Sequence, residues 1–407
     1  MLKLKQIKNS IFIALWMMVL TFPIMVIKVN TIDNIVIWRW MNLLYIGIGT
    51  FILSALWHLL MSRRNRDEEK KKSPLKDKIV VAKEVLGRPK VSKPIYFGIL
   101  GLAVIFPFIT TLYQTSIMIT ALMYVILGLG LNIVVGLGGL LHLGYAAFYA
   151  IGAYTYALLH KYAGLSFWVC LPLGGISAMV LGILVGLPVL RLRGDYLAIV
   201  TLGFGEITRI ILENVSGITG GPAGISGIPR PSFFGVHMKL GVAINYTYFL
   251  TLLLVLFTIF VVRRLEHSRL GRSWIAMRED EVASQAMGID ITRAKLSSFA
   301  LGALWAGLAG VFFSAKTTFV NPASFTLWES VIILCVVVLG GIGSIKGVIV
   351  GAIVIILLPE YLRAFSEYRM LVFGLALVLM MIFRPGGFIP AKRKLYTFEK
   401  KKTEVSG

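Results

Sequence analysis

Glu206 and Arg209 have the residue types and the spacing that could do chemistry inside a membrane. They lie three residues apart in the apolar run 196–213, so on a helix their side chains are neighbours that can form an ion pair. A helix that enters the membrane after Asp195 places Glu206 roughly 16 Å along its axis, near the bilayer midplane. A carboxylate at that depth is costly. It indicates either a structural ion pair or a contact for a zwitterionic solute, and both interpretations stay open.

No catalytic constellation accompanies this pair. The stretch GGIGSIKG at 340–347 fails the G-x-x-x-x-G-K-[ST] spacing of a phosphate-binding loop. The five histidines lack the spacing of metal ligands, and Cys170 and Cys335 each lie inside an apolar run. We therefore expect no enzyme activity, no metal and no cofactor in this chain. The energy for its activity must come from elsewhere.

The elements that position these residues are membrane helices. Of the 407 residues 57% are hydrophobic and only 15% are charged, with a mean hydropathy of +0.83, which is too apolar for a soluble fold of this length. About 20 apolar residues cross a bilayer as a helix. Such runs occupy residues 9–29, 36–61, 94–113, 116–137, 141–160, 166–190, 196–213, 244–262, 295–315, 326–343, 346–359 and 368–384.

We predict an all-α, polytopic integral membrane protein with about twelve membrane segments. Two segments, 141–160 and 346–359, are short or glycine-rich enough to be re-entrant or half-helices, which lowers the expected number to between ten and twelve. Barrel strands are disfavoured because they alternate apolar and polar residues, whereas these runs are apolar on every side.

The basic residues predict the orientation. The net charge is +22, and the basic residues crowd into the tails and into alternate loops, as the positive-inside rule requires. Both termini are therefore expected in the cytoplasm. No nucleic-acid-binding motif accompanies the charge, so nucleic acid is not an expected partner, whereas the lipid bilayer is.

The order of apolar runs and charged segments divides the chain into four parts. Residues 1–61 form an N-terminal pair of transmembrane helices, and 62–93, with its charge runs and two prolines, form a cytoplasmic linker. Residues 94–391 form the main helical core. Residues 392–407 form a basic cytoplasmic tail.

The stretch RSWIAMREDEVASQAMGID at 272–290 is polar although it lies between two apolar runs. Ser273 is a plausible N-cap and Gly288 a plausible helix stop, so we predict one helix of about 14 residues. Burying Glu279, Asp280 and Glu281 in hydrocarbon would cost several kcal/mol. The helix must therefore lie in the cytoplasm, either resting on lipid headgroups or docking into a groove on a soluble partner.

Two glycine-rich stretches have a structural and a functional interpretation. In 128–145 and 339–352 small residues let helices pack closely, which explains most of the 41 glycines. Broken helices there would expose backbone groups to a substrate, and Asn132 joins Glu206 and Arg209 as a candidate for the substrate path.

Five ordered segments carry a family resemblance. Together they resemble the permease of branched-chain amino acid ABC transporters of the LivM type, and they are GYAAFYAIGAYTYALL (144–159), RLRGDYLAIVTLGFGEI (191–207), TGGPAGISGIPRP (219–231), RSWIAMREDEVASQAMGID (272–290) and VVLGGIGSIKGVIVGA (337–352). The resemblance covers about 94–391. It implies import of leucine, isoleucine and valine across the bacterial cytoplasmic membrane. It also implies a homologous permease subunit, two ATP-binding cassette subunits that use ATP, and an extracytoplasmic amino-acid-binding protein.

The resemblance also suggests roles for particular residues. The stretch 272–290 is similar to the coupling loop that inserts into the ATPase subunit, but the Glu-Ala-Ala-x-x-x-Gly pattern is only partly met. The candidates for coupling are Arg278, Glu279, Asp280, Glu281, Ala283 and Gly288. The candidates for contact with the binding protein lie in the outer loop 214–243 and are Gly220, Gly221 and Pro222.

Two alternatives stay open at this point. Related permeases for urea, other amides or other amino acids share these motifs. An ion-coupled secondary transporter also uses carboxylates inside the membrane, such as Glu206.

Overall fold

A computed structural model gives the structure of the chain. It describes residues 89–391, except 190, 191, 193, 233–238, 363–368 and 385, and between residues 1 and 88 only 11–12, 15–16, 18, 22, 27–30, 35–38, 40–41, 44, 47–51 and 54. The predicted linker up to residue 88, the basic tail 392–407 and the two arginines of RLRG therefore lie outside the described residues. So does most of the predicted N-terminal helix pair.

The chain divides into two compact units, Met1–Leu100 and Gly101–Gly407. In the first unit, strand β1 (Ile27–Asn30) pairs antiparallel with strand β2 (Ile35–Trp38), and Ile27 lies opposite Trp38. The prediction of helix over 27–29 and 36–38 is thus wrong. Strand β2 consists of isoleucine, valine and tryptophan, and β1 contains Ile27 and Val29, side chains that favour extended backbone.

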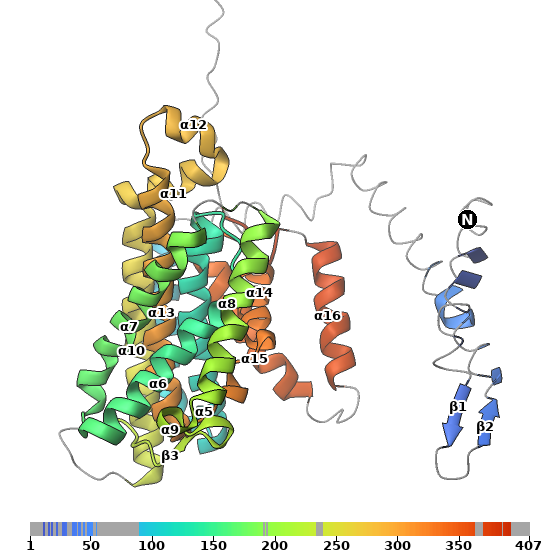
Figure 1. The fold of residues 1–407 in the computed structure, drawn as a ribbon, viewed down its shortest axis with the longest axis horizontal. Coiled ribbons are helices and arrows are strands. Elements are labelled where there is room, and N and C mark those ends of the chain that lie inside the picture. The colour runs from blue at the N-terminus through green and yellow to red at the C-terminus, as the bar shows by residue number, and fades with distance from the viewer. Residues whose placement is uncertain are drawn as a thin grey trace, which may run out of the picture. The chain divides into compact units, whose positions relative to one another are not determined.

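The second unit is a helical bundle (Figure 1). Each of the ten apolar runs predicted from residue 94 onwards contains a helix. These helices are α4 (Pro89–Ile109), which begins in the first unit, and α5 (Leu112–Leu131), α6 (Tyr145–Ala163), α7 (Phe167–Val189), α8 (Asp195–Asn214), α10 (Leu240–Glu266), α13 (Ile291–Thr317), α14 (Leu327–Gly340), α15 (Ile345–Tyr361) and α16 (Arg369–Phe383). An all-α, polytopic architecture is confirmed.

Five helical segments among the described residues are long and apolar enough to cross a bilayer. They are Leu112–Leu137, Phe167–Pro188, Leu240–Glu266, Ile291–Thr317 and Pro322–Gly340. The two segments predicted as possible half-helices form α6 and α15, which run for 19 and 17 residues. A total of ten to twelve membrane segments stays a prediction.

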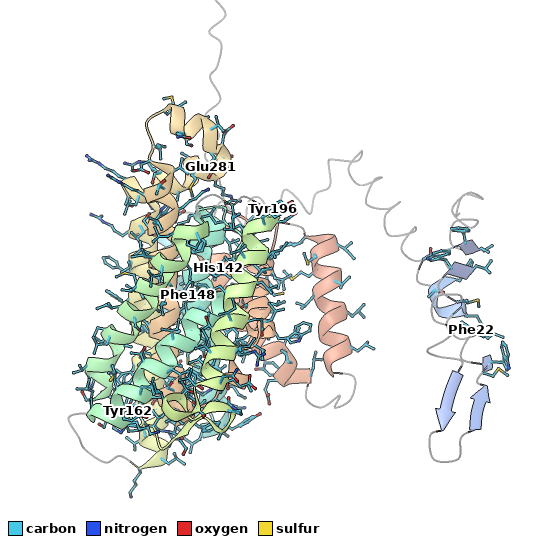
Figure 2. All side chains as sticks on the ribbon, viewed as in Figure 1. Phe22, His142, Phe148, Tyr162, Tyr196 and Glu281 are labelled. Carbon is cyan, nitrogen blue, oxygen red and sulfur yellow. The ribbon has the colours of Figure 1, made fainter. Side chains whose placement is uncertain are left out.

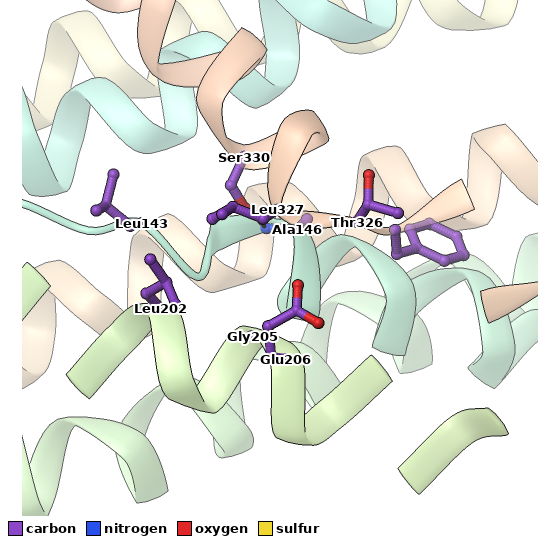
Figure 3. A pocket seen from close by; sticks show the side chains of 9 residues that line it. Leu143, Ala146, Leu202, Gly205, Glu206, Thr326, Leu327 and Ser330 are labelled. Carbon is purple, nitrogen blue, oxygen red and sulfur yellow. Dashed lines mark hydrogen bonds between the residues drawn. The ribbon is translucent and has the colours of Figure 1, made fainter. Parts of the chain in front are cut away.

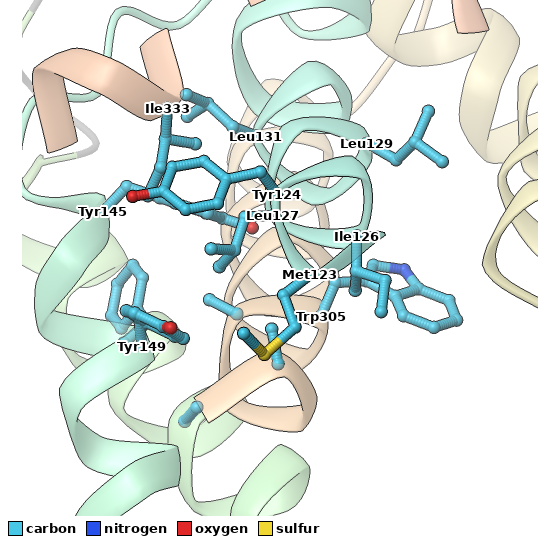
Figure 4. Packing of buried hydrophobic residues seen from close by; sticks show 14 of the residues in the cluster. Met123, Tyr124, Ile126, Leu127, Leu129, Leu131, Tyr145, Tyr149, Trp305 and Ile333 are labelled. Carbon is cyan, nitrogen blue, oxygen red and sulfur yellow. The ribbon is translucent and has the colours of Figure 1, made fainter. Parts of the chain in front are cut away.

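Helix α13 occupies the middle of the bundle and packs against α5, α6 and α7. The contact is close because glycines meet backbone: a Cβ added to Gly152 of α6 would lie 2.1 Å from the Gly307 carbonyl oxygen of α13. Small residues permit this approach between membrane helices. Around them, large apolar side chains such as Met123, Tyr145 and Trp305 fill the interior (Figure 4).

Short elements mark the two ends of the bundle (Figure 1). Helices α11 (Arg269–Glu279) and α12 (Glu281–Ala286) project from one end, and α9 (Ser216–Thr219) with the two-residue strand β3 (Ile225–Ser226) lies at the other. Strand β3 pairs with β4 (Phe319–Val320), which directly follows α13. Helix α13 therefore connects the two ends.

Candidate functional site

The polar stretch 272–290 forms a hairpin of two helices rather than the predicted single helix. Ser273 lies inside α11, whose N-cap is Ser268, and the Ser268 hydroxyl accepts from the Gly271 N–H at 3.1 Å. Helix α11 then ends at Asp280, which adopts an extended backbone with φ −157°. Its carboxylate caps α12 by accepting from the Ala283 N–H at 2.9 Å. The predicted stop at Gly288 coincides with a left-handed residue of φ +83°.

Two of the predicted coupling residues point into the bundle. Glu281, labelled in Figure 2, forms an ion pair with Lys295 of α13, and the two side chains are only 17% and 5% exposed. The Arg278 guanidinium donates from Nη1 to the Gly136 carbonyl oxygen. These contacts attach the hairpin to the membrane core.

Several apolar side chains of the hairpin are exposed. Val282 is 65% exposed and Met287 83% exposed, and Ala283 and Ala286 are also exposed. Gly288 and several charged or polar residues are exposed as well, namely Arg269, Arg272, Glu279, Asp280 and Gln285. On the opposite side, Trp274 is fully buried, and its indole N–H donates to the Ser297 hydroxyl at 3.0 Å. The hairpin therefore combines an anchored inner side with an outer side that exposes apolar side chains among charged ones, a surface suited to docking.

The Arg278 contact reaches an irregular helical segment. Residues Asn132–Leu137 continue α5 as a π-helix, η1, a geometry that often marks functional positions. The Arg278 stem covers Gly139, where φ is +70° and an added Cβ would lie 2.6 Å from Arg278 Cγ. Only glycine fits this position, because both the backbone conformation and the space exclude a side chain.

Asn132 begins η1 and is 1% exposed. Its side-chain oxygen accepts from the Gly343 N–H at 2.9 Å, which connects η1 to the turn between α14 and α15. Its amide nitrogen has no hydrogen-bond partner among the described residues. Of the three predicted path residues, Asn132 is thus the one buried inside the chain.

Glu206 and Arg209 lie together on α8, as the spacing predicts. Glu206 Oε2 accepts from Arg209 Nε at 2.9 Å, and Arg209 Nη1 also donates to Glu213 at 2.8 Å. The side chains are between 27% and 41% exposed. The second carboxylate, Glu213, was not predicted, although the i,i+4 spacing from Arg209 could have identified it.

Glu206 also lines a small pocket of about 170 Å³ between α6, α8 and the start of α14 (Figure 3). Ser330 lies on the opposite wall and accepts from the Ala146 N–H at 2.9 Å. The rest of the lining comprises Leu143, Ala146, Leu202, Gly205, Phe325, Thr326 and Leu327. Asn132 is absent from this lining, so the structure does not gather the three predicted path residues at one pocket.

The sequence prediction missed two charged side chains on the walls of the bundle core. Lys316, at the end of α13, donates to the Thr120 hydroxyl, and Glu329, in the first turn of α14, accepts from the Tyr124 hydroxyl. A signal was available, because each is a lone charge at one end of an apolar run. No group of three or more potential metal-ligating side chains occurs among the described residues.

The predicted binding-protein contacts lie in a compact loop at the end of the bundle remote from the hairpin. Gly220 and Gly221 have φ of +75° and +56°, and Gly221 is buried. Pro222 and Ala223, in the turn η2 (Gly221–Ala223), are exposed. Pro222 therefore lies on the surface of the loop, whereas Gly221 supports its fold.

Comparisons with known proteins identify relatives of the chain. Residues 113–381 match the family described as branched-chain amino acid transport system / permease component. The chain is 49% identical over 316 residues to the high-affinity branched-chain amino acid transport system permease protein LivM of Salmonella typhimurium, covering 73% of this chain and 74% of that protein.

More distant relatives have related names. The probable branched-chain amino acid transport permease protein LivM of Methanocaldococcus jannaschii is 30% identical over 57% of this chain and 72% of its own length. The permease protein LivH of Escherichia coli is 24% identical over 65% of this chain and 91% of its own length. No solved structure matches the chain.

Proposed function

The chain belongs to the branched-chain amino acid transport permease family, and we propose that it carries leucine, isoleucine and valine across the cytoplasmic membrane as one permease subunit of an ABC importer. A second, homologous permease subunit completes the membrane pathway. Two ATP-binding cassette subunits supply the energy. The names of the relatives favour branched-chain amino acids over urea or other amides as the solute.

The observation that carries this proposal is the α11–α12 hairpin. A polar hairpin at one end of an apolar bundle, with Val282 and Met287 exposed at 65% and 83%, fits an apolar groove on a soluble subunit. In this arrangement the hairpin lies in the cytoplasm. Its outward residues Glu279, Ala283 and Gly288 contact the ATPase subunit, while Arg278 and Glu281 carry its displacement into the bundle.

The contacts of those two residues suggest a mechanism of alternating access. When the ATPase subunits close on ATP, the hairpin moves with its groove. Arg278 is bonded to η1 through Gly136, and Glu281 is paired with Lys295 of α13, so the motion reaches two core helices at once. A shift of α5 and α13 changes the side of the membrane to which the path opens.

The charges on α8 suggest which side of the bundle meets the second permease. Tyr196 and Ile199 on the same helix are 72% and 64% exposed, as expected of a helix that faces lipid or protein. Exposed charges inside hydrocarbon are costly, so Glu206 and Arg209 are expected to face protein or a water-filled path. We assign them to the path between the two permease subunits.

The compact loop around Pro222 is the proposed contact for the extracytoplasmic amino-acid-binding protein. It lies at the end of the bundle opposite the hairpin (Figure 1), so a cytoplasmic hairpin implies an extracytoplasmic loop. With this orientation both chain termini are expected in the cytoplasm.

The decisive experiment is uptake by proteoliposomes that contain this chain, its partner permease and the ATPase subunits, with the binding protein added outside. We expect uptake of radiolabelled leucine that requires ATP in the lumen and persists when the proton gradient is dissipated. Uptake without ATPase subunits, lost when the gradient is dissipated, would establish an ion-coupled transporter instead. Ligand binding to the isolated binding protein separates branched-chain amino acids from urea and amides.

A further inference from the structure

Two opposite charges project toward the same helix, and neither has an ionic partner among the described residues. Lys316 of α13 and Glu329 of α14 each bond to one neutral hydroxyl, those of Thr120 and Tyr124 on α5. Neither residue forms an ion pair within the described part of the chain. Both side chains are only partly exposed.

A charge removed from water is normally paired with an opposite charge. A single hydroxyl replaces only part of the hydration that each charged group has lost. Each group can therefore still bind a group of opposite charge. Lys316 can take a carboxylate and Glu329 an ammonium group. The arrangement differs from the α8 cluster, where Arg209 already pairs with Glu206 and Glu213.

The two charges bond to residues on the same face of α5. Thr120 and Tyr124 are four residues apart, so they lie on one face of the helix about 6 Å apart. A positive and a negative group that bond to neighbouring turns of one helix offer a partner to each end of a small zwitterion, because an α-amino acid carries both a carboxylate and an ammonium group.

A cavity adjoins the positive end of this pair. It has a volume of about 290 Å³, and Ser116, Ile119, Arg230, Ile244, Thr247 and Lys316 line it. Arg230 has no hydrogen-bond or ion-pair partner among the described residues, so two cations border the cavity without a described carboxylate. Ile119 and Ile244 add an apolar wall against which an aliphatic side chain can pack.

We propose that the α5–α13–α14 junction, with Lys316 and Glu329 at its two poles, is a binding site for the transported amino acid. Lys316, with Arg230 behind it, receives the carboxylate; Glu329 receives the ammonium group. The inference rests on the proposed function and adds a recognition site within this subunit.

The position of the site in the bundle suits entry of the solute from the extracytoplasmic side of the membrane. Lys316 lies one residue before the end of α13, remote from the hairpin that precedes this helix. The first turn of α14 connects the site to the pocket of Figure 3, because Glu329 faces α5 while the adjacent Ser330 lines that pocket with Glu206. A solute released from this site would next meet the α8 cluster.

The test uses the complete transporter, purified in detergent without the binding protein, and direct binding of radiolabelled L-leucine. The variants are Lys316→Gln and Glu329→Gln, which retain a group able to bond the hydroxyl. Each should weaken leucine binding by roughly tenfold or more, the usual effect of losing one charged hydrogen bond. Matched controls are Glu360→Gln, which alters an exposed tyrosine–glutamate contact with Tyr113, and Lys239→Gln at an exposed lysine. Both controls should bind leucine as the wild type does.

A competition experiment on the wild-type complex tests the same idea without any variant. We expect 4-methylpentanoate, which lacks the ammonium group, and L-leucinamide, which lacks the carboxylate, to compete at least tenfold more weakly than unlabelled leucine. Equal competition by either analogue would overturn the zwitterion site, and so would unchanged leucine binding in both charge variants. Weakening by Lys316→Gln alone would also overturn it and indicate a simple anion site. Failure of ATP-driven leucine uptake by the wild type would instead refute the proposed function.

Discussion

Replacing Arg278 tests whether the hairpin drives the bundle through η1. The variant Arg278→Met keeps an apolar stem over Gly139 but removes the guanidinium that donates to the Gly136 carbonyl oxygen. We expect ATP hydrolysis to continue, because the outward surface around Val282 and Met287 is unchanged. Leucine uptake should fall, because the hairpin then moves without displacing η1.

The size of the effect follows from the bond that is lost. A hydrogen bond from a charged donor to a partly buried carbonyl contributes about 1.5–3 kcal/mol. If this free energy couples hairpin position to the conformation of α5, its loss changes the coupling equilibrium by about 10- to 150-fold. The quantity to measure is the number of leucine molecules transported per ATP hydrolysed in proteoliposomes.

Arg272 provides the matched control for Arg278. It lies on the same helix, is exposed, and donates from Nη1 to the His267 carbonyl oxygen at 2.9 Å. That bond stays within the hairpin and its preceding turn, so Arg272→Met should leave the transport ratio near the wild-type value. An unchanged ratio in Arg278→Met, or an equal loss in both variants, would refute the reasoning.

Three further predictions address packing, the path and the outer loop. Gly152→Ala should lower the melting temperature, with a destabilisation of about 1–3 kcal/mol, because its Cβ would meet the Gly307 carbonyl oxygen at 2.1 Å. Gly203→Ala is the control and should be neutral or stabilising, because nothing lies within 4 Å of the added Cβ. A lower melting temperature for Gly203→Ala than for Gly152→Ala would contradict this account of the packing. Glu206→Gln should raise the KM for leucine uptake by roughly threefold or more, whereas normal rate and affinity would exclude a direct role. Ala223→Arg in the exposed turn should weaken stimulation of ATP hydrolysis by the binding protein, and unchanged stimulation would remove this turn from the contact.

Hydropathy predicted the helices of the bundle because burial in lipid imposes a simple rule on each segment. An apolar run long enough to cross must be helical to satisfy its backbone, and each of the ten runs from residue 94 onwards contains a helix. The same rule failed at 27–29 and 36–38, where local side-chain preferences produced the short β1–β2 hairpin. Hydropathy also could not predict that α11 and α12 are two helices. The break between them depends on the extended backbone of Asp280, which caps α12, and this single residue leaves no mark on the spacing of the apolar side chains.

Contacts between distant segments were beyond prediction for a different reason. Glu206 and Arg209 could be paired from the sequence because they lie one turn apart on one helix. Tyr124 and Glu329 are 205 residues apart, and Thr120 and Lys316 are 196 apart. Only the packing of α5 against α13 and α14 brings these groups together, so the sequence could mark Lys316 and Glu329 as unusual charges but could not identify their partners.

The three consecutive acids of the hairpin illustrate the same limit. Their transfer cost predicts that the stretch avoids lipid, but that cost is the same for all three and assigns them no separate roles. The structure separates them: Glu279 is exposed, Asp280 caps α12, and Glu281 pairs with Lys295. Two of the three charges therefore hold the hairpin in shape and in place. We therefore expect the proposed docking of a soluble subunit to depend mainly on Val282 and Met287, the strongly exposed apolar side chains, rather than on the acids.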